Sequence, residues 1–283
     1  MKKINYSVFL LLTFVLGLAV FLYPTISDYV NSKSQSRVIN EYSDEVAKLD
    51  KTLVNELIAN AHEFNVQHKD KENPFFLAED ELDNYFAQLR LNDTPIMGSL
   101  EIPVIDVKLP IYHGTDDSVL QVGIGHFIGS SLPVGGIGTH SILSGHRALP
   151  SATLLSHLDR VEIGDTFSID IMTEKFVYEV DQILIVDPKD ISALLISKEN
   201  DYVTLLTCTP YGQNTHRLLV RGHRIEYTPE EEALNLRVTH DAIQIDSTLV
   251  AQIMALPVIL IFFIYLIIKS SIRPKGPYVR KQD

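Results

Sequence analysis

The chain has 283 residues, enough for one sizeable domain with appendages. Its formal net charge is −12, and the terminal segments 1–23 and 269–283 hold seven of the 24 basic but one of the 36 acidic side chains. The segment between them therefore carries 17 basic and 35 acidic side chains. Nucleic-acid-binding proteins present a basic surface to phosphates, and no DNA- or RNA-binding motif is present, so nucleic acid is excluded as an expected partner.

Two apolar runs lie near the ends of the chain, at Val8–Tyr23 and Leu249–Ile268. Each is close to the roughly 20 residues that cross a bilayer. The first is either an uncleaved anchor or a cleaved signal peptide, and the flank FLYPTISDYV lacks a small-residue cleavage pattern. We predict anchors at 1–25 and 249–269. Basic residues on the outer flanks predict that both termini, including a tail at 270–283, are cytoplasmic and that the segment between the anchors is outside the plasma membrane.

The segment 29–92 is predicted to be mainly helical. Apolar residues recur at helical spacing up to about residue 65, without glycine or proline. The pattern then fails in HKDKENPFF, where a charge cluster and Pro74 interrupt any helix. A loop at about 67–80 is therefore expected, followed by a short helix in DELDNYFAQLRL.

From residue 93 to 228 the chain is predicted to be a β domain. Runs rich in Val, Ile, Leu and Tyr recur between glycine, proline and aspartate, for instance SLEIPVI, THSILSGH, DYVTLLTC and HRLLVRGHRIEY. Short strands at this spacing are typical of an all-β barrel or sandwich. An acidic spacer at 229–248 leads back to the membrane.

Cys208 is the only cysteine, so no internal disulfide is possible. Free cysteines are often buried as small hydrophobic residues, and composition alone favours that interpretation. A nucleophilic cysteine needs its thiolate, which a nearby imidazole or guanidinium stabilises. Cys208 ends the strand-like run 202–207 and precedes a turn, so its sulfur is expected at the end of a strand.

Two residues could assist this thiol. Arg217 opens the next strand-like run, so pairing of the two strands would bring it to the same end of the sheet as Cys208. There it could stabilise a thiolate and an oxyanion, although for Arg217 taken alone a surface ion pair is the better explanation. His146 ends the run SILSGH; His140 and His146 could also begin a metal site, but no third ligand is evident. His113 and His126 are expected to be structural.

The stretch TLLTC, followed nine positions later by Arg217, resembles the signature of the sortase family. Further stretches, EIPVIDVKLPIYHGT, GHFIGSSLPVGG and LLTCTPYGQNTHRLLVRGHR, resemble the pilus-associated class C sortases from about Glu45 onward. The resemblance implies an eight-stranded β-barrel with N-terminal helices and flanking transmembrane helices. It also implies a membrane-bound cysteine transpeptidase of Gram-positive bacteria. We expect no cofactor and assign no metal ligands, because no carboxylate cluster that would match the calcium site of other sortases is evident.

The resemblance implies the roles of individual residues. Cys208 is the expected nucleophile, His146 the general acid and base, and Arg217 the clamp for the oxyanion, with Ser144 and Thr207 in the substrate groove. The enzyme would cut an LPxTG-like sorting motif between Thr and Gly, hold a pilin as a thioacyl intermediate, and pass it to a lysine of the next pilin. With ordinary pKa values of about 8.5 and 6.5, only about 1% of an isolated Cys–His pair is thiolate–imidazolium, so a third group is needed.

Class C sortases carry a lid, a loop with an Asp-Pro-aromatic motif that covers the active site. The matching residues here are Asn73, Pro74 and Phe75. Asparagine in place of aspartate removes a charge-assisted contact to Arg217, so we expect a lid that is held mainly by packing of Phe75. The alternative is that NPFF is a plain turn with both phenylalanines in the core.

Two other functions are compatible with the sequence. One is a sortase that anchors surface proteins to peptidoglycan, against which the C-terminal anchor and the lid motif argue. The other is a non-catalytic membrane-bound scaffold for pilus assembly, which would have no reason to retain Cys208, His146 and Arg217 together.

Overall fold

The computed structural model describes residues 6–71, 74–91, 94, 96–226 and 247–271. They form two units, and each is described separately: residues 1–26 with 243–283, and residues 27–242. The helices are α1 (Tyr6–Val46), α2 (Lys51–His68), α3 (Glu79–Ala87), α4 (Asp117–Leu120) and α6 (Ser247–Ser271). The strands are β1 (Ile96–Ile102), β2 (Val107–His113), β3 (Ile124–His126), β4 (Thr139–Ser144), β5 (Thr166–Ile171), β6 (Glu174–Val186), β7 (Asp201–Thr209) and β8 (His216–Ile225).

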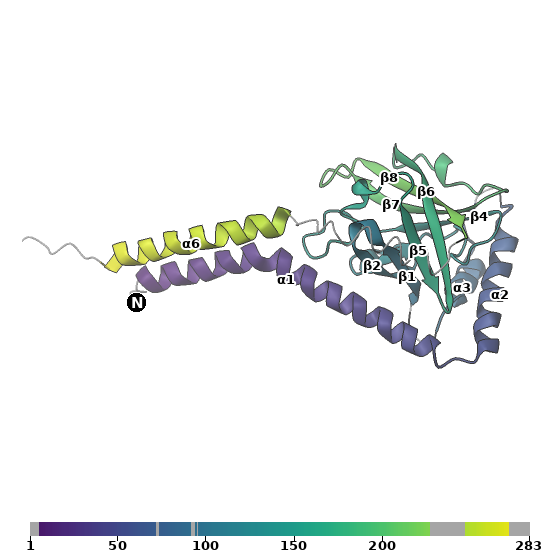
Figure 1. Ribbon diagram of the computed structural model, residues 1–283, viewed down its shortest axis with the longest axis horizontal. Coiled ribbons are helices and arrows are strands. Elements are labelled where there is room, and N and C mark those ends of the chain that lie inside the picture. The colour runs from purple at the N-terminus through teal and green to yellow at the C-terminus, as the bar shows by residue number, and fades with distance from the viewer. Residues whose placement is uncertain (1–5, 72–73, 92–93, 95, 227–246, 272–283) are drawn as a thin grey trace, which may run out of the picture. The chain divides into compact units, whose positions relative to one another are not determined.

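The eight strands close into a barrel in the order β1-β2-β3-β4-β7-β8-β6-β5. Figure 1 shows these strands together, with α2 and α3 beside them. The pairs β2–β3 and β4–β7 are parallel, and the other pairs are antiparallel. This confirms the predicted eight-stranded barrel and its N-terminal helices. Closure leaves no exposed sheet edge.

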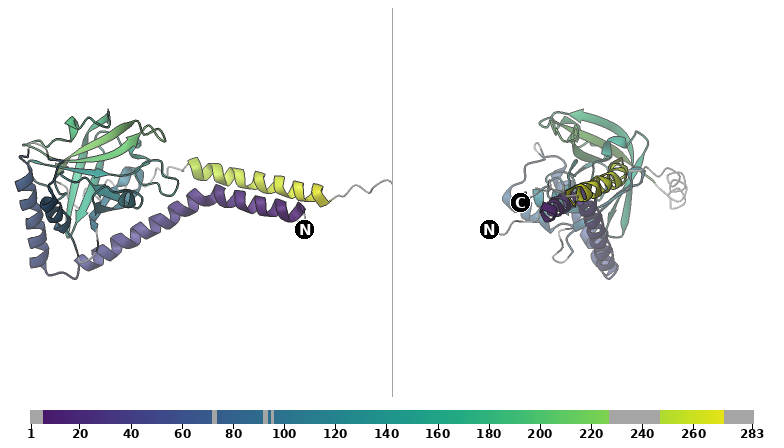
Figure 2. Two further views of the ribbon diagram at one scale, coloured as in Figure 1. Left: turned by 180° about the vertical axis from the view of Figure 1, so that it is seen from behind. Right: turned by 90° about the vertical axis from the view of Figure 1, so that its left-hand side faces the viewer.

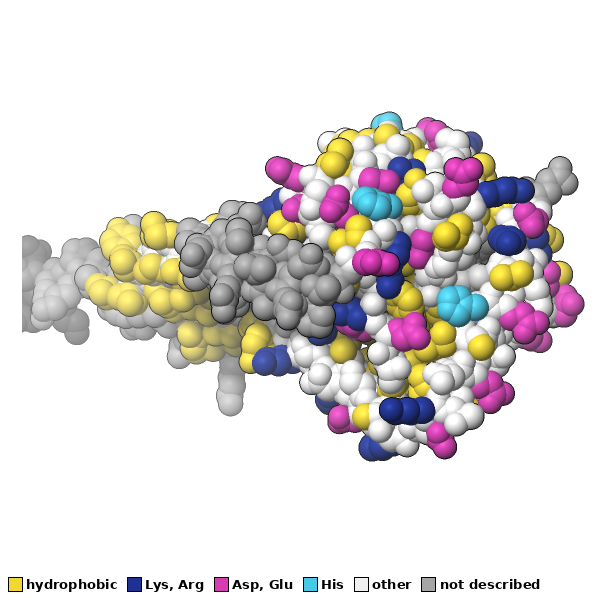
Figure 3. Space-filling model, turned by 45° about the vertical axis from the view of Figure 1, so that its right-hand side comes forward, with side chains coloured by type: hydrophobic (Ala, Val, Ile, Leu, Met, Phe, Trp, Pro, Cys, Tyr) yellow, Lys and Arg dark blue, Asp and Glu magenta, His cyan; other side chains and the backbone are white. Residues whose placement is uncertain are grey.

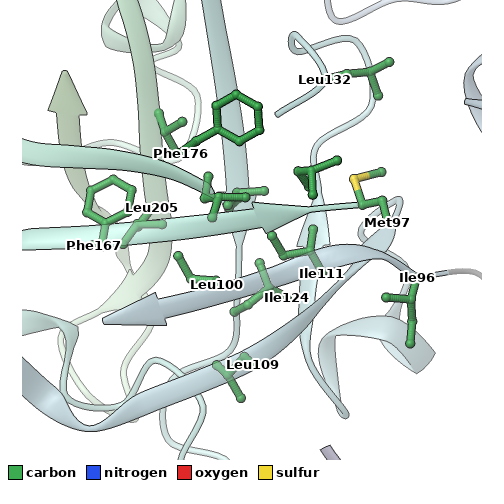
Figure 4. Packing of buried hydrophobic residues seen from close by; sticks show 14 of the residues in the cluster. Ile96, Met97, Leu100, Leu109, Ile111, Ile124, Leu132, Phe167, Phe176 and Leu205 are labelled. Carbon is green, nitrogen blue, oxygen red and sulfur yellow. The ribbon is translucent and has the colours of Figure 1, made fainter. Parts of the chain in front are cut away.

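Alternate residues of each strand fill the barrel, because successive side chains point to opposite faces. Leu100, Ile111, Ile124 and Leu205 have no exposed surface. Together with Phe167 they converge in the interior shown in Figure 4. Apolar burial of this extent is the main stabilising contribution to the barrel.

The helix α2 packs against the barrel, as Figure 1 and the left view of Figure 2 show. Its N-cap is Asp50, whose side chain accepts a hydrogen bond from Thr52 N at 2.9 Å. Its buried apolar residues recur every three or four positions, at Val54, Ile58, Ala61 and Phe64, and Asn65 is buried next to the last of them. Asn65 donates to Leu132 O and accepts from Leu132 N, so its side chain attaches the helix to the connection between β3 and β4.

The first unit contains the apolar part of α1 and the helix α6. Within the described residues one helix, in the span Leu11–Val46, is long and apolar enough to cross a membrane, as N-terminal signal sequences also are. The apolar stretch Ala251–Leu266 of α6 is shorter. The Phe14 and Phe263 rings stack at 3.9 Å, and Gln252 Nε2 donates to Phe21 O at 3.2 Å, so α6 packs alongside α1.

The face of the molecule in Figure 3 carries acidic and basic side chains interspersed. Solvent screens the attraction between exposed charged groups, so these side chains favour solubility more than they stabilise the fold.

Candidate active site

The strand β7 is flanked by β4 on one side and β8 on the other. On the β8 side Cys208 is the register partner of Arg217, as the sequence predicted for neighbouring strands. On the β4 side Ser144 is opposite Leu206, and the bond from Gly145 N to Leu206 O at 3.0 Å continues that register by one residue. The next residue, His146, is therefore level with Cys208. The fold thus brings Cys208 between His146 and Arg217.

The side chains of β7 alternate between the barrel interior and its outer face. Leu205 and Thr207 are 0% and 1% exposed, whereas Leu206 and Cys208 are partly exposed. Register partners in a sheet point to the same side, so Cys208 and Arg217 both project outward. Thr207 points the other way, and its hydroxyl donates to Gly145 O at 2.8 Å. Thr207 therefore offers no surface to a groove, whereas Ser144 is partly exposed on the outer face.

His146 lies two residues beyond the end of β4. Its side chain is 30% exposed, and its Nε2 lies 3.7 Å from Oδ1 of Asp117. The other oxygen of Asp117 accepts from Gln121 Nε2 at 2.8 Å, one turn along α4. An acidic group beside the imidazole was not predicted from the sequence, since only the fold brings residues 117 and 146 together.

Arg147 connects the segment that carries His146 to the segment that carries Cys208. Its guanidinium donates to Thr209 Oγ1 and to Ser156 O, both at 3.2 Å, and forms an ion pair with Asp159 at 2.5 Å. The side chain is 7% exposed, so these are low-dielectric, charge-assisted contacts. Arg147 directly follows His146 and Thr209 directly follows Cys208, so their hydrogen bond links the two segments of the site. No role was predicted for Arg147 from the sequence. Its position directly after His146 was the one feature that could have indicated a role in the site.

Arg217 is oriented by the backbone of the β7–β8 turn. Its Nη1 donates to His216 O at 3.1 Å and to Asn214 O at 3.3 Å. Carbonyl groups leave the positive charge of the guanidinium intact, so it remains available to an anion at the end of the strand.

A second apolar cluster covers the outer face of the sheet next to Cys208. We call it the outer cluster; its members come from β4, β6, β7, β8 and the segments around them. They are Ile142, Leu194, Leu219, Phe75, Phe127, Leu184, Val186, Ala193 and Leu206. Leu206 is two residues from Cys208 on the same strand and the same face, so this cluster adjoins the thiol.

The segment that follows α2 contributes Phe75 to the outer cluster. The rings of Phe75 and Phe127 meet edge to face at 5.5 Å, with an interplanar angle of 87°. Pro74 is buried, whereas Phe76 is 71% exposed, and Asn73 lies outside the described residues. Of the two phenylalanines, only Phe75 therefore packs on the sheet.

Gly129 makes this packing possible. It has φ +88°, and a Cβ added to it would lie 2.2 Å from Pro74 O and 2.7 Å from Phe75 Cα. A side chain cannot fit there without displacing the 74–75 segment.

Two other histidines are buried and neutral. Burial lowers the pKa of His126 to about 4, and it bonds Tyr85 OH at 2.9 Å and Ser131 O at 2.8 Å. Burial also lowers the pKa of His140 to about 4, and its two nitrogens contact Leu195 O and Thr204 Oγ1. Both ring nitrogens of His140 therefore have hydrogen-bond partners within the protein. Over the described part of the chain, no group of three His, Cys, Asp or Glu side chains could hold a metal ion.

A half-buried thiol between an imidazole and a guanidinium, beside an apolar surface, has the groups that acyl transfer through a thioester requires. Such a site defines a cysteine acyltransferase. The comparisons with known proteins agree: residues 100–225 match the family model described as Sortase domain. Sortase D of Bacillus subtilis is 34% identical over 131 residues, which is 45% of this chain and 63% of that relative, less than two thirds of its length.

Solved structures match over more of the chain. Sortase C1 from Streptococcus agalactiae superimposes with a TM-score of 0.66 and 49% identity, covering 68% of this chain and all of that one. Sortase C from Streptococcus pneumoniae has a TM-score of 0.60 and 42% identity, covering 68% of this chain and 98% of that one. This chain belongs to the sortase family, whose members are cysteine transpeptidases.

Proposed function

We propose that this protein is a membrane-bound class C sortase that joins pilin subunits through lysine isopeptide bonds. The observation that carries the proposal is the register that brings His146, Cys208 and Arg217 to one end of three adjacent strands. The likeness to the streptococcal sortase C structures supports class C, and the S. pneumoniae enzyme is described with its pilin substrate specificity.

In the first half-reaction the Cys208 thiolate attacks the Thr carbonyl carbon of an LPxTG-like motif. Arg217 stabilises the oxyanion as the carbon–sulfur bond forms. The His146 imidazolium then donates its proton to the departing Gly amine, and the carbon–nitrogen bond breaks. The product is a thioester on Cys208, with a neutral imidazole beside it.

In the second half-reaction a neutral lysine ε-amine of the next pilin attacks the thioester. His146 accepts the amine proton, the carbon–sulfur bond breaks, and Cys208 leaves as the thiolate. An isopeptide bond replaces the peptide bond that was cut, so the exchange needs no water, nucleotide or external energy source.

The outer cluster, which includes Phe75, would bind the apolar part of the sorting motif. Because Phe75 packs on the same face as Cys208, it acts as a lid that the substrate must displace. With Asn73 before it instead of an aspartate, ring packing supplies most of the closing energy.

Packing of α6 on the apolar part of α1 supports two membrane spans. The Gln252 amide would satisfy its hydrogen bonds within this pair instead of in lipid. Both termini would then be cytoplasmic, and the barrel would face the cell wall.

The test is incubation of the full chain in detergent with an LPxTG-type peptide and a lysine-bearing acceptor peptide. Mass spectrometry should detect the acyl fragment on Cys208 and then an isopeptide-linked product. Cys208→Ala should abolish both, and Arg217→Ala should lower kcat by about 100-fold or more, because an oxyanion donor is lost. Equal cleavage by Cys208→Ala would refute the mechanism. If a peptidoglycan stem peptide, offered in place of the lysine-bearing peptide, were the only acceptor used, the acceptor would be the cell wall and not a pilin.

A further inference from the structure

The loop that follows His146, residues 147–157, is folded tightly on itself. We call it the His146 loop. Leu155 N donates to His146 O at 3.2 Å, and Ala148 N donates to Ser156 Oγ at 3.3 Å. His146 itself is outside the β4 ladder, which ends at Ser144. The position of its backbone therefore depends on this loop.

The outer side of the His146 loop is attached to α1. Asp28 Oδ1 accepts from Thr153 N at 2.6 Å, and Asn31 Nδ2 donates to Ser151 O at 2.8 Å. Residues three apart share a face of a helix, so one face of α1 binds two backbone groups of the loop. Both bonds are partly buried, where a hydrogen bond is stronger than in water.

The same face of α1 reaches the other segment beside His146. Gln35, one turn beyond Asn31, is 9% exposed and donates from Nε2 to Val122 O at 3.1 Å. Val122 follows the short helix α4, which carries Asp117 opposite the imidazole. Residues 28, 31 and 35 thus bind both segments that lie beside His146, the His146 loop and the segment that follows α4.

We propose that this face of α1, formed by Asp28, Asn31 and Gln35, positions His146 for catalysis. The inference rests on the proposed function of His146 as the general acid and base. Misplacing a catalytic group by about 1 Å can cost up to about 100-fold in rate, so three bonds on the supporting backbone are enough to control turnover. The helix that begins in the apolar segment is then part of the working enzyme and does more than anchor it.

The test compares variants of the full chain in detergent. The double variant Asp28→Ala, Asn31→Ala should lower kcat about tenfold and leave KM within about twofold, since the substrate-binding cluster is not altered. Asp28→Asn keeps an oxygen acceptor for Thr153 N and should retain activity near that of the wild type. Matched controls on the same helix are Ser32→Ala, whose hydroxyl bonds Tyr29 O, and Glu41→Ala, an exposed partner of Arg37.

A second measurement does not depend on turnover. Selective carbon-13 labelling of the ten histidine rings, with His146→Gln to assign the signal, reports the environment of the imidazole. The His146 signal should move in the double variant and stay in place in both controls. Unchanged kcat and an unchanged signal in a folded double variant would overturn the inference. If the wild type itself forms no acyl-enzyme while the signal still moves, the proposed function fails and the structural link stands.

Discussion

The hydroxyl of Thr207 donates to Gly145 O at 2.8 Å, and this bond joins the strand end that carries Cys208 to the segment that carries His146. Thr207→Val keeps the shape of the side chain and removes the donor, leaving a buried carbonyl without its partner. We expect the free energy of unfolding to fall by about 1–3 kcal/mol. Urea unfolding measures it. Thr207→Ser keeps the hydroxyl and loses only the methyl group, so it should be more stable than Thr207→Val; a Val variant as stable as the wild type would show that this hydrogen bond contributes little.

Phe75 is expected to limit access to Cys208. Phe75→Ala removes the edge-to-face contact with Phe127, and so the 74–75 segment should leave the outer cluster more often. Alkylation of the thiol by a small reagent should become severalfold faster. Phe76→Ala is the matched control, because that ring is already 71% exposed. Equal alkylation rates in the two variants would show that Phe75 does not cover the thiol.

Gly129→Ala tests the same segment from the opposite side. The new methyl group would collide with Pro74 O, so the lid should be displaced and alkylation of Cys208 should again accelerate. The control is Gly164→Ala, which has a similar backbone angle, φ +94°, and no atom within 4 Å of the new Cβ. Backbone strain is therefore common to both variants. Faster alkylation in Gly129→Ala alone identifies the collision as the cause.

The sequence predicted the local part of the site and missed the rest for identifiable reasons. Cys208 and Arg217 are nine residues apart on adjacent strands, so their pairing followed from strand patterns and is confirmed. His146 reaches them through a parallel pairing across 62 residues, which no local pattern encodes. Its position at the end of a strand-like run made it a candidate, and the family resemblance linked it to Cys208. The contacts of Arg147 and Asp28 depend on loop conformation and had no periodic signal. The catalytic roles themselves stay predictions.

Asp117 is expected to have a small effect. Its carboxylate is 81% exposed, and the 3.7 Å separation from His146 Nε2 is too long for a hydrogen bond, so solvent screens most of the attraction. Asp117→Asn should therefore change kcat/KM by no more than about threefold, with a smaller difference at high salt. Asp116→Asn, the neighbouring exposed acid, is the control. A tenfold loss confined to Asp117→Asn would make this carboxylate a working part of the site.

The buried histidines should make the barrel sensitive to acid. His126 and His140 have pKa values of about 4 in the folded protein, against 6.5 for an ordinary imidazole, because burial opposes their charge. Between pH 6.5 and 4 the unfolded chain therefore binds more protons than the folded one, and stability falls as the pH falls through this window. From pH 7 to pH 5 each histidine should cost of order 2 kcal/mol of unfolding free energy. In His140→Gln this loss should shrink by about that amount, measured as the difference between urea unfolding at the two pH values. His62→Gln, at an exposed position, is the matched control, and an unchanged slope in His140→Gln would show that His140 is not the group that titrates.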